Sequence, residues 1–379
     1  MFEQLSHLAL QQYWWFIVST LGGILVFLLF VQGGQTLLHR LGKSEEEITF
    51  LVNVFGHTWG LTFTTLVTFG GALFASFPLV YSTYFGGGYW LWMLVLSTFI
   101  LQAVSYEFRN KVGNVLGQKT FEWFLFLNGL VGTISLGVAV ATFFTGTNFV
   151  HNQMNFTSWA NGWHGLEAFA NPINWLLGLA VFFLSRTMAL LYIMNRVEDE
   201  NILQRSKKQL WICAPLFLVF FLAFVISIWL SNGYGYLASG EVVTIQYKYF
   251  LNLIQHPLVG LTFLVGVLLV LLGLIRALFF FTKCRKRAIW FVGFGTFFAV
   301  LSLFLNLGYN HTVILPSLVN LQDSLTIENA SSSYFTLVVM SYVSLLVPFV
   351  VAYIAYVWYS MNKKPITLDE FKESETESY

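Results

Sequence analysis

The sequence predicts an all-α, polytopic membrane protein with about nine transmembrane helices. Its 379 residues are 57% hydrophobic and only 10% charged, whereas soluble domains carry about 25% charged residues. The apolar segments are long and continuous, which indicates helices, because only helices and closed barrels satisfy their backbone polar groups in a bilayer. The basic residues also gather on one side of these segments. We expect residues 1–364 to form a single transmembrane domain and residues 365–379 a short acidic tail.

Nine segments approach or exceed the length of about 20 apolar residues that a helix needs to cross the hydrocarbon core. Their predicted bounds are Tyr13–Gly34, Val54–Tyr81, Tyr89–Val104, Phe121–Thr145, Pro172–Met194, Leu210–Leu230, Leu258–Thr282, Ala288–Leu307 and Tyr334–Tyr359. Ser44 followed by Glu47 is typical of a capping box and indicates an earlier start for the second helix.

The distribution of Lys and Arg predicts the orientation. If the N-terminus lies outside, sixteen of the 19 basic residues fall on the inner side. They are Arg40, Lys43, Arg109, Lys111, Lys119, Arg196, Arg205, Lys207, Lys208, Lys283, Arg285, Lys286, Arg287, Lys363, Lys364 and Lys372. Lys248 alone lies outside, and Arg186 and Arg276 lie within spans. Because cytoplasmic loops carry an excess of Lys and Arg, the C-terminus is predicted to be cytoplasmic.

One charge lies deep in a predicted span. Arg186 is about ten residues from Arg196, or about 15 Å of helix. An ionisable group at this depth is costly, and it marks either a functional site or a structural tie to a neighbouring helix. Both interpretations stay open. Arg276, about seven residues from Lys283, lies close enough to a helix end to extend its head group to the interface.

Polar groups near the inner ends of the first three spans are candidates for a proton path or an interface. Glu107 and Arg109 end the third helix, where the carboxylate could relay protons or pair with Arg109 or Lys111. Gln32 and Gln35 flank two glycines that allow close helix approach. His57 and Trp59 lie at the inner end of the second helix.

No complete active site is predicted within this chain. The seven histidines fall in loops, in the N-terminal segment or near the ends of spans: His7, His39, His57, His151, His164, His256 and His311. Haem takes His, Met or Cys as axial ligands, so the chain alone is not expected to bind haem. It has no GxxxxGK[ST] or HExxH motif, which leaves no predicted metal site, and its net charge of +1 does not indicate a nucleic-acid partner.

An ordered set of motifs resembles subunit II of the cytochrome bd quinol oxidases over about residues 13–360. The specific blocks are Gly-Gly-Ala-Leu-Phe-Ala-Ser-Phe-Pro-Leu-Val-Tyr at 70–81 and Ser-Leu-Thr-Ile-Glu-Asn-Ala-Ser-Ser-Ser at 324–333. Trp14-Trp15, Trp59, Phe108-Arg109-Asn110-Lys111, Pro316-Ser317 and Leu346-Val-Pro-Phe-Val350 accompany them.

The resemblance implies a haem-free subunit in a bacterial inner membrane. In this family nine helices form two four-helix bundles plus a peripheral helix. The chain pairs with a subunit I that carries haems b and d and the quinol site, in a complex that oxidises quinol and reduces O2 to water. Subunit II supports assembly of that partner, and in some members it lines a proton path or holds a structural quinone. Membrane lipids complete the expected surroundings.

This chain departs from the family at three positions. Well-known members carry carboxylates where Gln32, Gln35 and Gly60 stand here. Glu107 matches an acidic position of the family and is therefore the predicted proton relay. Two other functions are alternatives, a secondary transporter and a membrane scaffold. A secondary transporter would be expected to carry more charge near the midplane than Arg186 alone, and a membrane scaffold without a redox role would differ mainly in its partner.

Overall fold

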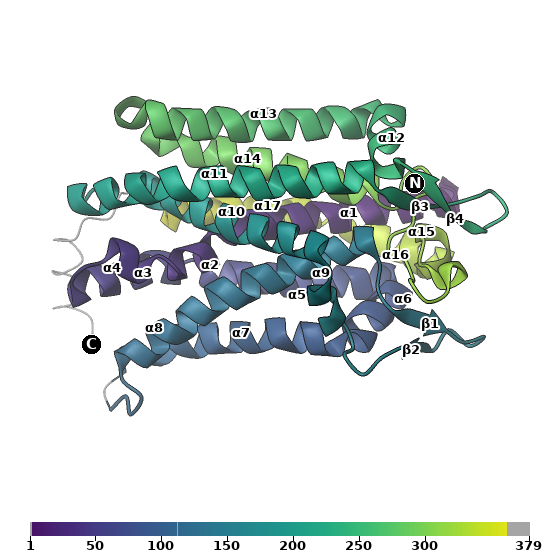
Figure 1. The fold of residues 1–379 in the computed structure, drawn as a ribbon, viewed down its shortest axis with the longest axis horizontal. Coiled ribbons are helices and arrows are strands. Elements are labelled where there is room, and N and C mark those ends of the chain that lie inside the picture. The colour runs from purple at the N-terminus through teal and green to yellow at the C-terminus, as the bar shows by residue number, and fades with distance from the viewer. Residues whose placement is uncertain (1, 112, 362–379) are drawn as a thin grey trace.

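The computed structural model describes residues 2–111 and 113–361, so the predicted acidic tail lies outside the described residues. Within that part of the chain, nine helical segments are long and apolar enough to cross a membrane. They lie along the long axis of the molecule (Figure 1). The predicted all-α, polytopic architecture is therefore confirmed.

Among the first four crossings, the first, second and fourth are interrupted helices and the third is continuous. The first joins α1 (His7–Leu28) to α2 (Phe30–Gln35), and the second joins α4 (Glu45–Gly56) to α5 (Trp59–Ser76). The third is α7 (Tyr89–Phe108). The fourth runs through α8 (Gln118–Leu127), the π-helical segment η3 (Asn128–Gly132) and α9 (Thr133–Thr145).

The remaining crossings are longer single helices followed by one broken helix. They are α10 (Pro172–Arg196), α11 (Glu200–Leu230), α13 (Pro257–Phe279), α14 (Phe281–Asn306) and the pair α16 (Tyr334–Ser344) and α17 (Val347–Met361). Short helices fill the connections: η1 (Phe2–Gln4), α3 (Leu38–Leu41), α6 (Pro78–Tyr81), η2 (Ser82–Gly87), η4 (Leu166–Ala170), α12 (Lys248–Gln255), η5 (Leu321–Asp323) and α15 (Ile327–Ala330).

Several predicted bounds need correction. The earlier start of the second span is confirmed, because the Ser44 hydroxyl accepts a hydrogen bond from the Glu47 backbone N–H. The same span ends at Ser76 rather than at Tyr81, since Pro78 begins a separate short helix. The helix predicted from Leu210 begins ten residues earlier, where Asp199 caps it by accepting from the Ile202 N–H. Charged turns thus extend these helices beyond their apolar segments.

The two ends of the molecule differ in structure. Two antiparallel hairpins, β1 (Phe149–His151) with β2 (Thr157–Trp159) and β3 (Asn232–Tyr236) with β4 (Val242–Gln246), lie at the end where α1 begins. We call this the hairpin end. The opposite end, where α8 begins and α17 ends, carries the ion pairs of Arg109, Lys111, Arg205 and Lys286, and we call it the basic end.

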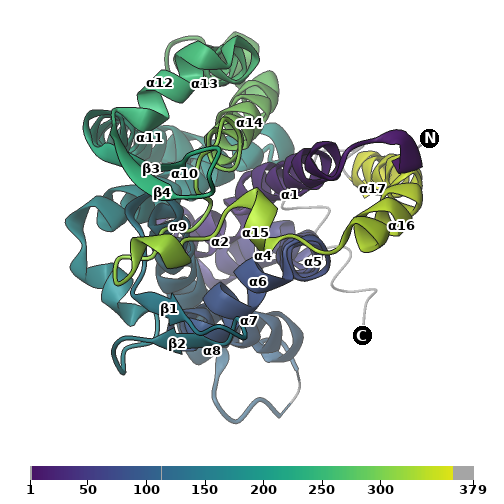
Figure 2. The ribbon, with the colours of Figure 1, turned by 90° about the vertical axis from the view of Figure 1, so that its right-hand side faces the viewer.

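Helix α10 is the central helix of the fold, packed against α2, α9, α11 and α14. Its approach to α2 is so close that a Cβ added to Gly33 would lie 2.1 Å from the backbone carbonyl carbon of Ser185. Helices α16 and α17 lie at the edge of the molecule (Figure 2). Because α10 contacts helices from both halves of the chain, the division into two four-helix bundles stays a prediction.

A histidine ties three segments together at the hairpin end. The His151 Nε2 lies 2.9 Å from the Thr83 hydroxyl, and its Nδ1 lies 3.3 Å from the Asp323 carbonyl oxygen. The carbonyl can only accept, so Nδ1–H donates and the neutral ring accepts from Thr83. Burial lowers the pKa of His151 below its usual value.

The hairpin end should therefore loosen on acidification. A folded-state pKa below the unfolded value of about 6.5 means that the unfolded state binds the proton more readily, so stability is lost as the pH falls below about 6.5. We expect amide hydrogen exchange in residues 149–159 to quicken between pH 7.5 and 5.5, and His151→Gln to abolish this local difference. If hydrogen exchange in His151→Gln depends on pH as it does in the natural protein, His151 is not the group responsible.

Candidate functional site

A row of polar side chains runs inside the bundle between α2, α7 and η3. Thr98, Gln102 and Tyr106 of α7 share one face with Arg109, the C-cap of that helix, since residues spaced by three or four positions are neighbours on a helix. From Thr98 to Arg109 this face extends about 16 Å along the helix axis towards the basic end. Thr98, Gln102 and Arg109 are buried, so the row belongs to the interior of the protein.

Neighbouring helices contribute amides to this row. The Gln32 side-chain amide donates to Oε1 of Gln102 at 3.2 Å, and the Asn128 side-chain amide donates to the Thr98 hydroxyl at 3.4 Å. Nearer the basic end, the Gln35 amide donates to the Tyr106 hydroxyl at 3.1 Å. We call these six residues the polar file: Gln32, Gln35, Thr98, Gln102, Tyr106 and Asn128. The Trp59 ring stacks on Tyr106 with the ring centroids 5.8 Å apart.

Four buried polar atoms of the file have no hydrogen-bond partner among the described residues. They are Gln32 Oε1, Gln35 Oε1, Gln102 Nε2 and Asn128 Oδ1. Leaving such a group unsatisfied costs about 1–3 kcal/mol, and buried polar atoms of this kind are normally paired with protein or with ordered water. The file is therefore chemically suited to holding water molecules between its amides.

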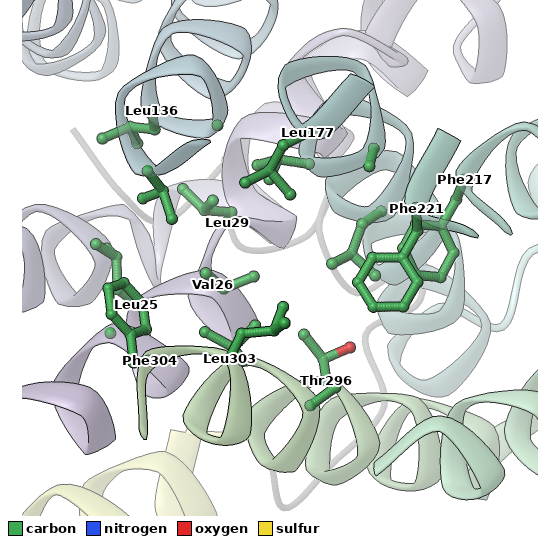
Figure 3. Close-up of a pocket in the computed structure, with 18 of the residues that line it drawn as sticks. Leu25, Val26, Leu29, Leu136, Leu177, Phe217, Phe221, Thr296, Leu303 and Phe304 are labelled. Carbon is green, nitrogen blue, oxygen red and sulfur yellow. The ribbon is translucent and has the colours of Figure 1, made fainter. Parts of the chain in front are cut away.

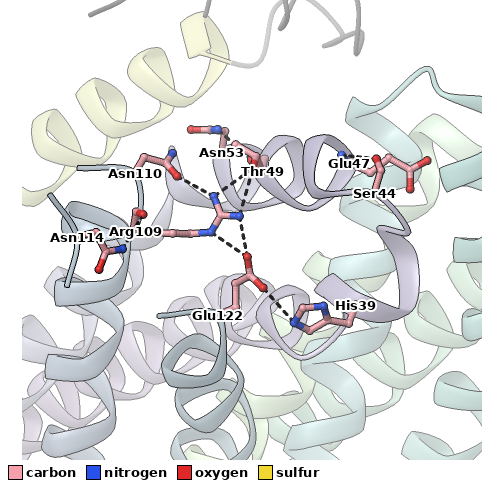
Figure 4. A network of polar contacts seen from close by, with 9 residues as sticks. All are labelled: His39, Ser44, Glu47, Thr49, Asn53, Arg109, Asn110, Asn114 and Glu122. Carbon is pink, nitrogen blue, oxygen red and sulfur yellow. Dashed lines mark hydrogen bonds and ion pairs between the residues drawn. The ribbon is translucent and has the colours of Figure 1, made fainter. Parts of the chain in front are cut away.

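A carboxylate lies buried at the basic end of the file, on α8 (Figure 4). Glu122 Oε1 accepts from Arg109 Nη2 at 2.7 Å and from Nε at 3.1 Å. Arg109 also donates to the Thr49 hydroxyl and to the side-chain amide oxygen (Oδ1) of Asn110. The exposed fractions of the two side chains are only 2% and 5%. A buried pair of this kind is sustained by its additional hydrogen bonds.

The second carboxylate oxygen faces towards solvent. Glu122 Oε2 lies 3.3 Å from His39 Nε2, and the His39 side chain is 57% exposed. The carboxylate thus bridges a buried guanidinium and an imidazole that solvent reaches. Along the chain, Glu122 lies six residues before Asn128 of the file, or about 9 Å of helix. A π-helical segment often marks a functional position, and η3 brings Asn128 into the row.

The structure brings together some of the predicted site residues and separates others. Gln32, Gln35 and Trp59 meet at the file, and Arg109 lies at its end. Glu107 does not belong to it.

Glu107 pairs with Lys111 at 3.1 Å, with 63% of its side chain exposed. Of the two pairings open to Glu107, the one with Lys111 is therefore observed, and its role as a proton relay stays a prediction. His57 is the exposed C-cap of α4, and its described side chain does not join the file.

Arg186 lies in the middle of α10. Its guanidinium carbon is 5.3 Å from the centre of the Phe182 ring. Its Nε is buried without a hydrogen-bond partner, and no hydrogen bond or ion pair joins Arg186 to another described residue. The predicted tie to a neighbouring helix is therefore not among the contacts of the described chain.

Sequence reasoning missed Glu122, Gln102 and Asn128. The sequence does carry a signal for each residue. Glu122 is an acid at the second position of a predicted span, and Gln102 and Asn128 are amides within apolar segments. Periodicity does not reveal which of two acids near Arg109 will face it, because the pairing with Glu122 crosses a loop of the chain.

A second interior feature is an apolar cavity of about 170 Å³ between α1, α9, α10, α11 and α14 (Figure 3). Leu25, Leu29, Leu136 and Phe221 are among its lining residues, and Thr296 is the one polar side chain in the lining. The lining residues include no His, Met or Cys, so the cavity offers no axial ligand for haem. It suits a hydrocarbon group instead.

Comparison with known proteins gives a consistent result. Residues 10–361 match the family described as cytochrome bd terminal oxidase subunit II. The chain is 28% identical to the cytochrome bd-I ubiquinol oxidase subunit 2 of Escherichia coli (strain K12) over 362 residues, which cover 92% of this chain and 93% of the relative. It is 27% identical to the cytochrome bd ubiquinol oxidase subunit 2 of Bacillus subtilis (strain 168), covering 94% and 97%.

A solved structure shares the fold. A chain of the bd oxidase from Geobacillus thermodenitrificans superimposes with a TM-score of 0.61 at 15% identity, covering 93% of this chain and 99% of that one. Together with the family match, this establishes the membrane fold and the family of the chain.

The two acids near Arg109 should differ sharply in their effect on stability. Glu122→Gln leaves a buried guanidinium without its counter-charge, and breaking a buried pair costs about 3–5 kcal/mol. Glu107→Gln breaks an exposed pair, which is worth no more than about 1 kcal/mol. We expect thermal unfolding of the purified complex to show a much larger decrease for the first variant. Equal decreases would mean that Glu122 is not the partner that Arg109 requires.

Proposed function

The chain belongs to the cytochrome bd terminal oxidase subunit II family, and from this premise we propose that it is the haem-free subunit of a quinol oxidase complex. Within that complex it would hold and support a haem-bearing subunit I, whose haems pass electrons from quinol to O2. The observation that carries this proposal is the family match over residues 10–361, which includes all nine candidate spans of the described residues except the first three residues of the first span. The transporter and the scaffold without a redox role are disfavoured by the same match.

We infer that the basic end faces the cytoplasm of a bacterial inner membrane. The excess of Lys and Arg in the loops at that end supports this orientation. A reporter fused after residue 379 that proved active on the outer side of the membrane would contradict it.

The polar file supports a route for protons through this subunit. His39 Nε2 and Glu122 Oε2 are 3.3 Å apart, close enough to pass a proton from solvent to the buried carboxylate. Beyond Glu122 the amides cannot take up protons themselves, so they would orient water molecules that do. In well-known relatives carboxylates stand at the positions of Gln32 and Gln35, and here water between the amides would replace them.

A quinone bound to this chain stays a proposal with a limited fit. The apolar cavity, at about 170 Å³, is close in size to a cavity of about 150 Å³ that holds benzene. It would therefore accept a segment of an isoprenoid tail and not a whole quinone. Thr296 could donate one hydrogen bond there, which is too little to fix a polar head group. The quinone content of an organic extract of the purified complex tests whether a quinone is bound.

The oxidase assignment predicts a coloured complex. Affinity purification of this chain from solubilised membranes should recover a partner with the reduced-minus-oxidised bands of haems b and d in stoichiometric yield. An organic extract of the same eluate would reveal any bound quinone. A colourless eluate, together with unchanged quinol oxidase activity after deletion of the gene, would contradict the assignment and favour the transporter.

The proton route predicts that a buried amide matters for turnover. Gln102→Leu removes a hydrogen-bonding group from the middle of the file, and we expect quinol oxidase turnover to fall about tenfold, which corresponds to about 1.4 kcal/mol in the barrier. Haem content should stay unchanged. Ser97→Ala, on the exposed face of the same helix, serves as the control. Full turnover in Gln102→Leu would refute the route, and loss of turnover in Glu107→Gln would move its entrance to that acid.

A further inference from the structure

The last crossing, at the edge of the molecule (Figure 2), is broken between α16 and α17. Helix α16 packs on α1, where Trp14 Nε1 donates to the Ser341 hydroxyl at 3.0 Å and the Tyr13 hydroxyl lies 2.7 Å from that of Ser344. Pro348 in the first turn of α17 has no N–H to donate to the Ser344 carbonyl, so the helix cannot continue unbroken. Within the described residues, α17 has no comparable packing on α1.

Contact with the rest of the molecule resumes at the basic end of α17. The ring centroid of Trp358 lies 5.9 Å from that of Phe30 and 6.3 Å from those of Phe27 and Tyr192. From Ser344 to Trp358 the crossing extends about 21 Å along its axis. It is therefore held against the bundle at both ends of this stretch.

The stretch between these contacts borders a groove of about 930 Å³ that also involves α1, α5 and α14. Apolar side chains form most of its walls, among them Leu21 and Ile24 of α1 and Val351 and Ile354 of α17. The last two are exposed although they line the groove, so the groove is open at the side of the molecule. Its volume lies near the upper end of the range of about 300–1,000 Å³ that ligand sites usually have.

A groove of this kind needs an apolar occupant of small width. The helices around it are candidate membrane spans, so it lies at the level of the hydrocarbon core. An empty groove would forfeit the dispersion contacts of its lining, and apolar walls give water no hydrogen bonds. Packed helices need about 8–10 Å between their axes, whereas the crossing contacts the bundle at both ends. A flexible hydrocarbon chain fits where a helix from another subunit does not.

The hydroxyls in the groove do not offer donors to a polar ring. Those of Thr64, Thr65 and Thr68 each donate to a backbone carbonyl oxygen of α5. The indole N–H of Trp14 is likewise engaged, with the Ser341 hydroxyl. A quinone ring needs donors for its carbonyl oxygens, whereas an acyl chain needs none. The middle of the groove therefore favours an acyl chain over a quinone head group.

Polar and amphipathic side chains line the groove at its basic end. They are Asn195, Trp290 and Tyr359. The Asn195 amide donates to the backbone carbonyl oxygen of Lys286, which holds it beside the start of the apolar part of α14. Trp and Tyr gather at the level of the lipid head groups in membrane proteins. A lipid that enters the groove from this end would thus keep its head group at the interface.

We propose that the groove binds an acyl chain of a phospholipid from the leaflet at the basic end. The head group lies at the level of Asn195, Trp290 and Tyr359, and the chain extends between α1, α5 and α17 towards Trp14. One leaflet contributes about 15 Å, half of the hydrocarbon core of about 30 Å, and the groove accommodates this length. The proposal does not depend on the redox role of the complex.

The segment that follows α17 is poorly suited to this place. Eight of the 18 residues at positions 362–379 are charged. Charged side chains are costly in the hydrocarbon region, so this segment does not match an apolar groove.

The test uses the complete complex, purified in detergent and supplemented with dioleoyl phosphatidylethanolamine. Native mass spectrometry measures the phospholipid that each variant retains. Ala355→Trp places an indole ring in the groove from an exposed position of α17, and we expect retention to fall about tenfold, the factor that corresponds to about 1.4 kcal/mol. Thr68→Phe, which fills the groove from the opposite wall on α5, should have the same effect.

Ala352→Trp is the matched control, because Ala352 is also an exposed alanine of α17 but does not line the groove. It should leave retention unchanged. Equal retention in the natural complex and in both filled variants would overturn the proposal. It would also be overturned if Ala355→Trp displaced a quinone or the partner subunit and left phospholipid retention intact. Retention that appeared only after deletion of residues 362–379 would assign the groove to that segment and overturn the proposal as well.

Discussion

The close contact between α2 and α10 at Gly33 fixes the geometry on which both interior sites depend. No side chain fits at Gly33, because its Cβ would lie 2.1 Å from the backbone carbonyl carbon of Ser185 and 2.4 Å from the backbone nitrogen of Arg186. A second approach is as tight, since a Cβ on Gly129 would lie 2.3 Å from the Gln32 carbonyl oxygen. These two contacts hold α2 between α10 and η3, so that Gln32 is directed to the polar file while Arg186 is held on the other side.

The interior polarity of the described chain is mostly neutral, and three of its buried charges, Arg109, Glu122 and Arg196, lie near the basic end. Amides at positions 32, 35, 102 and 128 cost far less to bury than ions, because each loses hydrogen bonds rather than charge hydration. The carboxylate of Glu122 is buried only where Arg109 and His39 lie within reach. Protons carried along such a file would travel on water rather than on side chains, and the protein would supply orientation and exclusion of lipid.

The sequence was sufficient for the architecture and insufficient for the site. Nine spans, the glycine seam at Gln32–Gln35 and the early start of the second helix follow from local patterns of hydropathy, small residues and capping. The π-helical segment at Asn128 and the pairing of Arg109 with Glu122 do not, because they depend on how separate helices meet. Glu107 is nearer to Arg109 in sequence, yet it points to solvent, and a difference of helical phase is enough to exchange the roles of the two acids.

Arg109 and Arg186 are two interior arginines whose charges are compensated to different extents by the described residues. Arg109 is almost fully buried and receives a carboxylate, a hydroxyl and an amide oxygen from its own chain. Arg186 lies deeper in the span, and within residues 2–111 and 113–361 it contacts only an aromatic ring in place of an acceptor. Among the described residues, the fold therefore compensates one interior cation with three oxygen acceptors and the other with an aromatic ring alone. Burial of Arg109 is offset by its hydrogen-bonded carboxylate, whereas burial of Arg186 costs free energy that its described contacts do not return.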